Sequence, residues 1–335
     1  MKKNGLTAAA AVLAIAGCSG YSGTQSVLPA ANGSPNLTAQ PSFVEFRVPT
    51  GASQPYDIVV GPDRNLWFTE QQGNKVARMT PTGSFTEYRA PNAASMPTGI
   101  ATGSDRALWF TENQYNVIVR TTTTGRMKAV RIPGGENIEP NEVANGPDGR
   151  IWLTLDYGNA IAAVALRTGT IKVYKLPNFN SHPQRIVVGP DRNLWFTEEV
   201  GNRIGRITTA GAIAEFTIPT VGSQPAGIVR GPDGRLWFAE SQGNKIGAIT
   251  IAGTITEYAI APSVDSEPTG IVSGSGGKLW FTEFSGNKIS SITTAGTVTR
   301  YAIPTANSQP NGIVVRRGTL WFTEFSGNKI GRFVP

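Results

Sequence analysis

A short phrase containing tryptophan recurs seven times along the chain, and this repetition restricts the fold more than any other feature. Each copy has the form Leu-Trp-Phe-Thr-Glu or a close variant. It follows a Pro-x-Gly-Ile-Val segment and a Gly-Pro-Asp-Gly turn, and it precedes Gly-Asn-Lys-Ile-Gly. The tryptophans are Trp67, Trp109, Trp152, Trp195, Trp237, Trp280 and Trp321. A period of about 42 residues is the length of one β-propeller blade, which contains four short strands.

The rest of each unit supports the same fold class. Four short β-like runs are separated by Gly, Pro, Asn or Asp turns. The chain has 39 Gly, 23 Pro and only 16% charged residues, a turn-rich composition that argues against a helical bundle. No segment after residue 18 has helical periodicity. We therefore predict an all-β, seven-bladed propeller over residues 43–335, with four antiparallel strands in each blade.

The two ends of the repeat region predict how the ring closes. The last unit stops at Pro335 after its third strand, and residues 43–48 have the pattern of the missing fourth strand. Pairing of these segments would cover the two edges that an open array leaves exposed. The Trp and Phe of each phrase should face opposite sides of their strand, so both should fill the packing layers between blades.

The first residues have the pattern of an export signal. Two lysines precede an apolar run over residues 6–15, and Ile-Ala-Gly-Cys, which ends at Cys18, resembles a bacterial lipobox. An ordinary signal peptide is the alternative. We predict a lipoprotein-type signal over residues 1–18, lipidation of Cys18 and a flexible tether over residues 19–42. The prediction is an exported protein that a lipid anchor, and not a membrane-spanning helix, holds at the cell envelope.

The first strand of each unit indicates a binding site at one mouth of the central channel. Thr269 and Glu283 are equidistant from the turn of their hairpin, so we expect them to be cross-strand neighbours. The same symmetry in the other units places residue x of each first strand near the mouth. These candidate ligand-binding residues are Tyr56, Thr98, Asn141, Gln184, Ala226, Thr269 and Asn311. Such a concave polar ring suits a small polar ligand, a peptide or a glycan.

Six of the seven tryptophan phrases end in glutamate, which allows a structural and a functional interpretation. In five units a Lys or Arg follows five residues later, as Arg203 follows Glu198, and the third unit lacks both members. This joint loss favours a structural ion pair, because buried carboxylates are usually paired. Glu112 has Val117 at the basic position and is therefore kept as a candidate ligand-binding residue. The aspartates of the Gly-Pro-Asp turns are interpreted as turn residues and not as calcium ligands.

Composition and charge exclude several functions. One Cys and one His cannot build a cysteine zinc site or a site of several histidines. The net charge of +7 is scattered and forms no basic stripe, so we expect no nucleic-acid partner. Seven phrases conflict with a six-bladed, calcium-dependent lactone hydrolase. We expect the protein to be a monomer.

The phrase at residues 231–240, Gly-Pro-Asp-Gly-Arg-Leu-Trp-Phe-Ala-Glu, is followed by Gly-Asn-Lys-Ile-Gly at residues 243–247. This combination resembles the streptogramin B (virginiamycin B) lyase family, and the resemblance extends over residues 43–335. Members of that family are seven-bladed propellers that open cyclic depsipeptide antibiotics by elimination at an ester linkage, with Mg²⁺. The resemblance implies that Tyr56 is an aromatic substrate contact.

The resemblance also implies roles for the fifth and sixth units. Glu267 and Glu283 match two carboxylates of the family and would hold Mg²⁺. The family's two histidine positions carry Ala226 and Thr269, which cannot remove a proton near neutral pH. His182, in the fourth unit, is the candidate for a relocated base.

Two functions follow from these residues. The first is a propeller that binds a polar ligand at the channel mouth without histidine-dependent catalysis. The alternative is a Mg²⁺-dependent carbon–oxygen lyase that opens a cyclic depsipeptide or related ester with a different base.

Overall fold

The computed structural model describes residues 40–260 and 266–335. The predicted signal over residues 1–18, its Cys18 and nearly all of the predicted tether lie outside these ranges. Within the described ranges, no helix is long and apolar enough to cross a membrane.

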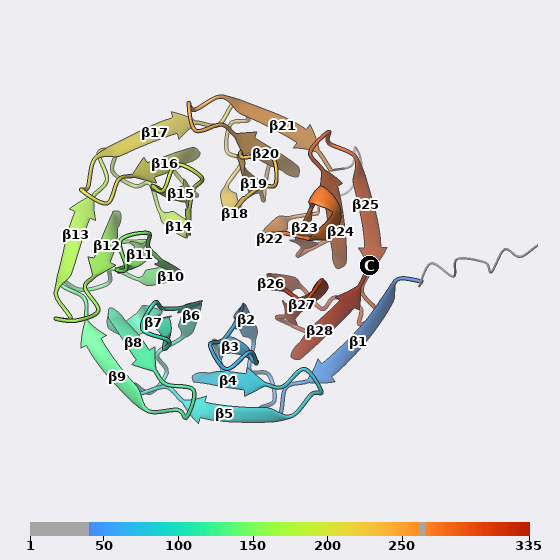
Figure 1. Cartoon of the computed structure of the whole chain (residues 1–335), viewed down its shortest axis with the longest axis horizontal. Helices are drawn as coiled ribbons and strands as arrows, with labels where there is room; N and C mark the ends of the chain where they lie inside the picture. The colour runs from blue at the N-terminus through green and yellow to red at the C-terminus, as the bar shows by residue number, and fades with distance from the viewer. Residues whose placement is uncertain (1–39, 261–265) are drawn as a thin grey trace, which may run out of the picture. The chain divides into compact units, whose positions relative to one another are not determined.

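Seven four-stranded antiparallel sheets form the blades of a propeller around a central axis (Figure 1). The innermost strands are β2 (Pro55–Val60), β6 (Pro97–Thr102), β10 (Pro140–Asn145), β14 (Pro183–Val188), β18 (Pro225–Arg230), β22 (Pro268–Ser273) and β26 (Pro310–Arg316). The second strands are β3 (Leu66–Glu70), β7 (Leu108–Glu112), β11 (Ile151–Leu155), β15 (Leu194–Glu198), β19 (Leu236–Glu240), β23 (Lys278–Glu283) and β27 (Thr319–Glu324). We number the blades 1 to 7 in the order of these strands.

The outer half of each blade is equally regular. The third strands are β4 (Lys75–Met79), β8 (Val117–Thr121), β12 (Ala160–Val164), β16 (Arg203–Ile207), β20 (Lys245–Ile249), β24 (Lys288–Thr293) and β28 (Lys329–Val334). The outermost strands are β5 (Phe85–Arg89), β9 (Met127–Arg131), β13 (Ile171–Lys175), β17 (Ile213–Thr217), β21 (Ile255–Ala259), β25 (Val298–Ala302) and β1 (Ser42–Arg47). In the part of the chain that the structure describes, two short 3-10 helices, η1 (Asn113–Tyr115) and η2 (Ser275–Gly277), lie in connecting loops.

The N-terminal strand closes the ring. β1 pairs antiparallel with β28, from Ser42 opposite Val334 to Arg47 opposite Lys329, and Figure 1 shows the two strands side by side. Glu45 of β1 also forms an ion pair with Lys329, at 2.7 Å. The predicted closure of the seventh blade by residues 43–48 is therefore confirmed.

The layers between blades form the hydrophobic core. The tryptophan of one blade packs in the same cluster as the second-strand residue of the next, as Trp67 does with Phe110 and Trp109 with Leu153. Across the closing seam, Trp321 of blade 7 packs in the same cluster as Phe68 of blade 1. Burying an aromatic side chain of this size contributes about 1.5–3 kcal/mol. The core role predicted for the repeated aromatic residues is confirmed.

The turn aspartates fix these tryptophans. The indole N–H of Trp67 donates to Asp63 at 3.0 Å, and that of Trp195 donates to Asp191 at 2.9 Å. Asp191 also accepts a hydrogen bond from the backbone N–H of Asn193, at 3.2 Å. These hydrogen bonds lower the pKa of Asp191, although burial opposes them. The interpretation of these aspartates as turn residues is confirmed, with an added role in orienting the indole ring.

A bulge at the start of each innermost strand changes the predicted register. Pro268 lies opposite Glu283 and Ile271 lies opposite Phe281, so two residues of β22 face one residue of β23. Thr282 accounts for the bulge, because its hydroxyl accepts a hydrogen bond from the backbone N–H of Gly270, at 2.8 Å. The predicted pairing of Thr269 with Glu283 is therefore wrong. The bulge lets the residue after x, as well as x itself, face the channel.

Candidate functional site

The starts of the innermost strands meet at one mouth of the channel and form a pocket of about 160 Å³, here called the mouth pocket. Five of the predicted residues at position x line it: Tyr56, Gln184, Ala226, Thr269 and Asn311. The other lining residues are Arg185, Glu199, Gln224, Pro225 and Ser241. The structure thus brings together most of the predicted ring and adds a cation and a carboxylate to it.

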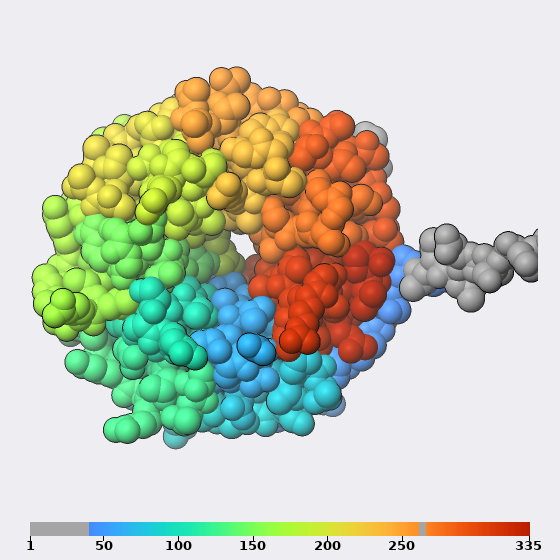
Figure 2. All heavy atoms as spheres, in the orientation of Figure 1, coloured from blue at the N-terminus to red at the C-terminus, as the bar shows by residue number. Residues whose placement is uncertain are grey.

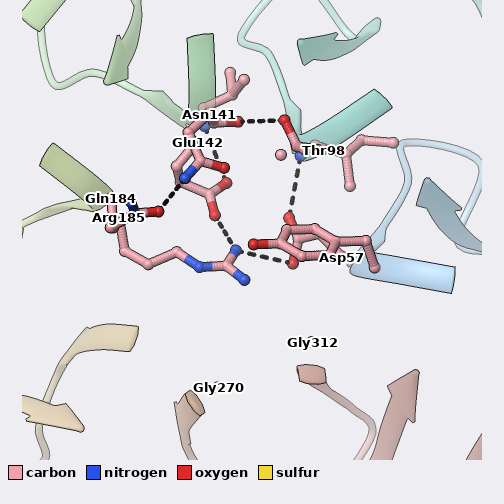
Figure 3. Close-up of polar contacts among 12 residues, drawn as sticks. Asp57, Thr98, Asn141, Glu142, Gln184, Arg185, Gly270 and Gly312 are labelled. Carbon is pink, nitrogen blue, oxygen red and sulfur yellow. Dashed lines mark hydrogen bonds and ion pairs between the residues drawn. The ribbon is translucent and has the colours of Figure 1, made fainter. Parts of the chain in front are cut away.

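Arg185 reaches across the centre of the ring (Figure 3). From β14, its Nη1 contacts Glu142 on β10 and lies 3.4 Å from Oδ1 of Asp57 on β2. Its guanidinium carbon lies 5.5 Å from the centre of the Tyr56 ring, within the range of a cation–π contact. Burial, reinforced by the neighbouring charge of Asp57, raises the pKa of Glu142. Three blades are therefore joined by one charged cluster.

A second cavity, also of about 160 Å³, lies along the channel and is lined by the same three charged residues. Its opposite wall is formed by blades 5 to 7, where the position after x is Gly227, Gly270 and Gly312. Figure 2 shows a narrow opening at the centre of the ring. The charged cluster therefore fills one side of the channel, and the glycine side stays open.

One wall of the mouth pocket continues into a hydrogen-bonded chain of polar residues. Gln184 Nε2 donates to Glu199 at 2.7 Å and to Asp156 at 3.1 Å. His182 Nδ1 lies 2.7 Å from Oδ1 of Asp156. Burial, followed by repulsion from Asp156, raises the pKa of Glu199. Glu199 lines the pocket, whereas His182 is not among its described lining residues and connects with it through Asp156 and Gln184.

A row of aromatic rings begins at Tyr56, which lines the mouth pocket. The Tyr56 and Phe325 rings lie 6.3 Å apart in an edge-to-face arrangement, and the Phe284 and Phe325 rings lie 6.1 Å apart. All three side chains are half-buried. We call Tyr56, Phe284 and Phe325 the aromatic shelf. Such a surface suits an apolar or aromatic group of a ligand.

Three predicted ligand-binding residues lie outside the pocket wall. Thr98 is buried, and its hydroxyl lies 3.2 Å from the carbonyl oxygen of Asn141. The side chain of Asn141 is also buried and donates to Gln184. Glu112 has no exposed surface and accepts a hydrogen bond from the Asn92 backbone N–H, at 3.3 Å. Asn141 thus holds Gln184 of the pocket wall from behind, whereas the hydrogen bonds of Glu112 connect it with Asn92.

The magnesium site implied by the resemblance does not fit the side chains present. Glu283 has no exposed surface, and its carboxylate accepts hydrogen bonds from Arg300 Nε, at 2.8 Å, and from Ser290. Glu267 is half-buried and accepts a hydrogen bond from Gln242 Nε2, at 3.2 Å. Mg²⁺ needs accessible carboxylate oxygens, and Arg300 already neutralises those of Glu283. Within residues 40–260 and 266–335, no group of three His, Cys, Asp or Glu residues could hold a metal.

The predicted ion pairs of the phrase-ending glutamates are only partly correct. Arg203 Nε does bind Glu198, at 3.0 Å. In blade 1, however, Lys75 binds Glu87 of the outermost strand, at 2.6 Å, and the same outward pairing occurs in blades 5 and 7. Burial and the charge of Glu87 then raise the pKa of Glu70 to about 7. In these three blades the structural partner of the lysine is an outer-strand carboxylate.

These buried carboxyls predict a stability that decreases at alkaline pH. The pKa values of Glu70, Glu240 and Glu324 rise from 4.5 to about 7, 8 and 8, mainly through burial. Between pH 4.5 and about 8 the folded state therefore binds more protons than the unfolded state, so the free energy of unfolding decreases as the pH rises and the loss is complete above these folded-state pKa values. We expect the triple variant Glu70→Gln/Glu240→Gln/Glu324→Gln to be more stable than the unchanged protein at pH 9 by more than ~3 kcal/mol, which is what the smallest of the three shifts contributes at about 1.36 kcal/mol per pKa unit.

Urea denaturation at pH 5 and pH 9 measures this effect, with the exposed Glu136→Gln as the control. At pH 5 the triple variant and the unchanged protein should unfold at similar urea concentrations. An equal difference at both pH values would contradict the assignment of raised pKa values to these carboxyls.

The charged cluster was missed in the prediction, although the sequence contains a signal for it. Four units have Gly after residue x, whereas units 1, 3 and 4 have Asp57, Glu142 and Arg185 there. These breaks in the repeat mark residues that face the channel. Glu199 was missed as well, and the sequence gives no such signal for it, because the position after the phrase differs between units and is also acidic at Asp156.

Comparisons with known proteins agree with this architecture. Residues 30–138 and 134–335 match the model of the Virginiamycin B lyase family. The structure is similar to selenomethionine-substituted virginiamycin B lyase from Staphylococcus aureus, with 38% identity and a TM-score of 0.84 over 88% of this chain and 100% of that chain. A catalytically inactive histidine-to-alanine variant of that enzyme with quinupristin gives the same values. A streptogramin B lyase structure is 36% identical, with a TM-score of 0.83 over 88% of this chain and 97% of that one. The chain therefore belongs to the virginiamycin B lyase family.

Proposed function

We propose that this protein is a carbon–oxygen lyase that opens a cyclic depsipeptide, or a related ring ester, in the mouth pocket. The observation that carries the proposal is the match to virginiamycin B lyase, which extends over 100% of that enzyme at 38% identity. The pocket supports it independently. Its lining includes both Tyr56, which belongs to the aromatic shelf, and Glu199, so an amphipathic ring can bind beside a base.

The proposed reaction needs a base but no external reactant. The base removes a proton from the carbon next to the alkyl carbon of the ester. The electron pair of that C–H bond becomes a C=C bond, the alkyl C–O bond breaks, and the carboxylate leaves. The ring opens to an isomer of the same mass, because nothing is added or lost.

Glu199 is the residue that we assign as this base. It lines the mouth pocket, and its raised pKa makes its carboxylate a stronger base than an ordinary exposed glutamate. Gln184 holds the carboxylate by a hydrogen bond of 2.7 Å, which fixes its orientation. His182, the base considered from the sequence, lies farther from the pocket, behind Asp156 and Gln184.

Binding without turnover is the second candidate function. Ala226 and Thr269 favour it, because they line the pocket at the family's histidine positions and offer no group that titrates near neutral pH. In that case the mouth pocket would hold a polar peptide, depsipeptide or glycan unchanged. The two candidates differ in a single observable, the appearance of a ring-opened isomer.

Substitution of the proposed base tests the assignment. We expect Glu199→Gln to lower the rate of ring opening by roughly 10²–10⁴-fold, the usual contribution of a general base, with little change in binding. Chromatography resolves the isomeric product, and mass spectrometry confirms its unchanged mass. Glu136→Gln, at an exposed loop position, serves as the control and should keep the full rate. A full rate in Glu199→Gln together with its loss in His182→Ala would instead place the base at His182.

The proposal also includes the cellular setting. The pattern of residues 1–18 supports export and lipid attachment at Cys18, and the Ser/Gly/Ala/Pro-rich residues 19–42 support a tether that separates the propeller from the membrane surface. We propose that the protein acts there as a monomer on a small ligand from outside the cytoplasm.

A further inference from the structure

The guanidinium of Arg185 has hydrogen-bonding capacity that the described residues do not use. Its five N–H donors form a planar fork, and only Nη1 contacts carboxylates, those of Glu142 and Asp57. Nε and Nη2 form no hydrogen bond with the described part of the chain. In Figure 3 the free edge of the guanidinium faces the open centre of the ring, opposite Gly270 and Gly312. This edge is therefore available to a ligand.

The two carboxylates beside Arg185 are already satisfied. Asp57 Oδ2 accepts a hydrogen bond from the backbone N–H of Ile100, at 3.0 Å, and Glu142 Oε1 accepts one from the backbone N–H of Val143, at 2.9 Å. Their other oxygens contact Arg185. The unused capacity of the cluster thus consists of donors, and a ligand group that binds there must be an acceptor.

The position of Arg185 defines the shape of that acceptor. Arg185 lines both the mouth pocket and the channel cavity, so its free edge forms the floor of the pocket. Nε and Nη2 are the pair of donors that bind a carboxylate side-on, through two parallel hydrogen bonds. The adjacent aromatic shelf is suited to an apolar group attached to that carboxylate. A small planar anion next to an aromatic group matches both surfaces.

We propose that Arg185 binds a carboxylate group of the ligand at the floor of the mouth pocket, with an adjoining aromatic group on the aromatic shelf. This inference rests on the proposed function and deepens it, because the group that leaves in the elimination is a carboxylate. Arg185 would then stabilise the negative charge that develops on the leaving oxygen atoms and would hold the opened product.

The charges around Arg185 predict how binding depends on pH. Asp57, Glu142, Glu199 and Tyr56 are the titratable groups that face Arg185 or the pocket. The raised pKa values of Glu142 and Glu199 mean that these carboxyls take up protons readily when another anion enters. We therefore expect carboxylate binding to strengthen as the pH falls from 8 to 6, with proton uptake on binding.

Equilibrium binding to the full-length protein tests the proposal without any turnover. The probes are N-acetyl-L-phenylalanine and its carboxamide, which differ only in the charge of the acceptor group, titrated by ligand-observed NMR at pH 6. We expect the acid to bind the unchanged protein at least about tenfold more tightly than the amide, the effect of one charge-assisted hydrogen bond. Arg185→Gln should reduce this ratio to about one. The exposed Arg317→Gln should leave it unchanged.

An uncharged variant serves as a control in case Arg185→Gln alone misfolds. Asp57→Asn/Glu142→Gln/Arg185→Gln replaces the ionic cluster by uncharged amides, leaves no unpaired charge in the channel, and should also show a ratio of about one. Three results would overturn the carboxylate site. The unchanged protein could bind the acid and the amide equally, it could fail to bind the acid, or Arg185→Gln could keep the same preference for the acid over the amide. Selective binding of the acid without any ring opening would support the carboxylate site and contradict the proposed lyase function.

Discussion

Deletion of residues 42–48 is expected to abolish the cooperative unfolding transition of this protein. The deletion removes β1, the fourth strand of blade 7, together with the ion pair between Glu45 and Lys329. It also removes Phe46 and Val48 from the layer that contains Trp321. Loss of large core side chains costs about 2–5 kcal/mol each, so the sum approaches the roughly 5–15 kcal/mol that stabilises a typical domain. Thermal denaturation followed by circular dichroism measures the result.

A deletion of equal length at residues 22–28 is the matched control, because it falls in the predicted tether. This control should melt like the unchanged protein. If the variant without residues 42–48 also melted cooperatively, within a few degrees of the unchanged protein, the ring would not depend on closure by β1.

Glu283→Gln is a nearly isosteric substitution for which we expect a large loss of stability. Its carboxylate is fully buried and holds Arg300 through an ion pair. Removing one partner of a buried pair typically costs about 3–5 kcal/mol, because the other charge stays behind. Arg300 is partly exposed, so we expect a value near the lower limit, about 3 kcal/mol. The second variant Glu283→Gln/Arg300→Gln should recover a large part of this loss. Urea denaturation at pH 7 measures both.

Glu240→Gln provides the matched comparison in the preceding blade. Glu240 occupies the same position of its tryptophan phrase but faces Glu257, so its loss should be neutral or stabilising at pH 7. Equal effects of Glu240→Gln and Glu283→Gln would contradict the ion-pair account. A gain of stability on addition of Mg²⁺ to the unchanged protein, absent in Glu283→Gln, would support the metal role that the structure does not fit.

The fold could be predicted from the sequence because the repeat carries most of the physical information. Tryptophans about 42 residues apart define the blade, and alternation along each phrase predicts that Trp67 and Phe68 fill opposite layers, as they do. The missing last strand and the extra strand at residues 43–48 predicted the closure by β1. These features depend on local residue patterns and on the number of repeats, both of which can be read directly from a sequence.

The details of the site depend on side-chain contacts that cannot be predicted from local residue patterns. The bulge at Gly270 arises because the Thr282 hydroxyl replaces a regular cross-strand contact, and symmetry about the turn alone missed it. Lys75 had two glutamates within reach, and only the structure shows that it binds Glu87 on the outermost strand. In blade 6, Arg300 takes the place of that outer glutamate, which is why Glu283 is paired there.

The charged cluster illustrates the same limit at the functional site. Asp57, Glu142 and Arg185 break the Pro-x-Gly pattern in a visible way, so each could be identified as unusual. Their meeting across the channel required the ring geometry, because Asp57 and Arg185 are far apart in the sequence. Departures from a repeat therefore identify candidate residues, and the closed ring decides which of them meet.

The most direct test of the central claim is incubation of the full-length protein with a cyclic streptogramin B depsipeptide, followed by chromatography coupled to mass spectrometry. We expect a new species of unchanged mass and altered retention, formed at the same rate with Mg²⁺ or with a chelator. A substrate that stays intact at high protein concentration would contradict the lyase function, and a product heavier by one water would indicate hydrolysis instead of elimination.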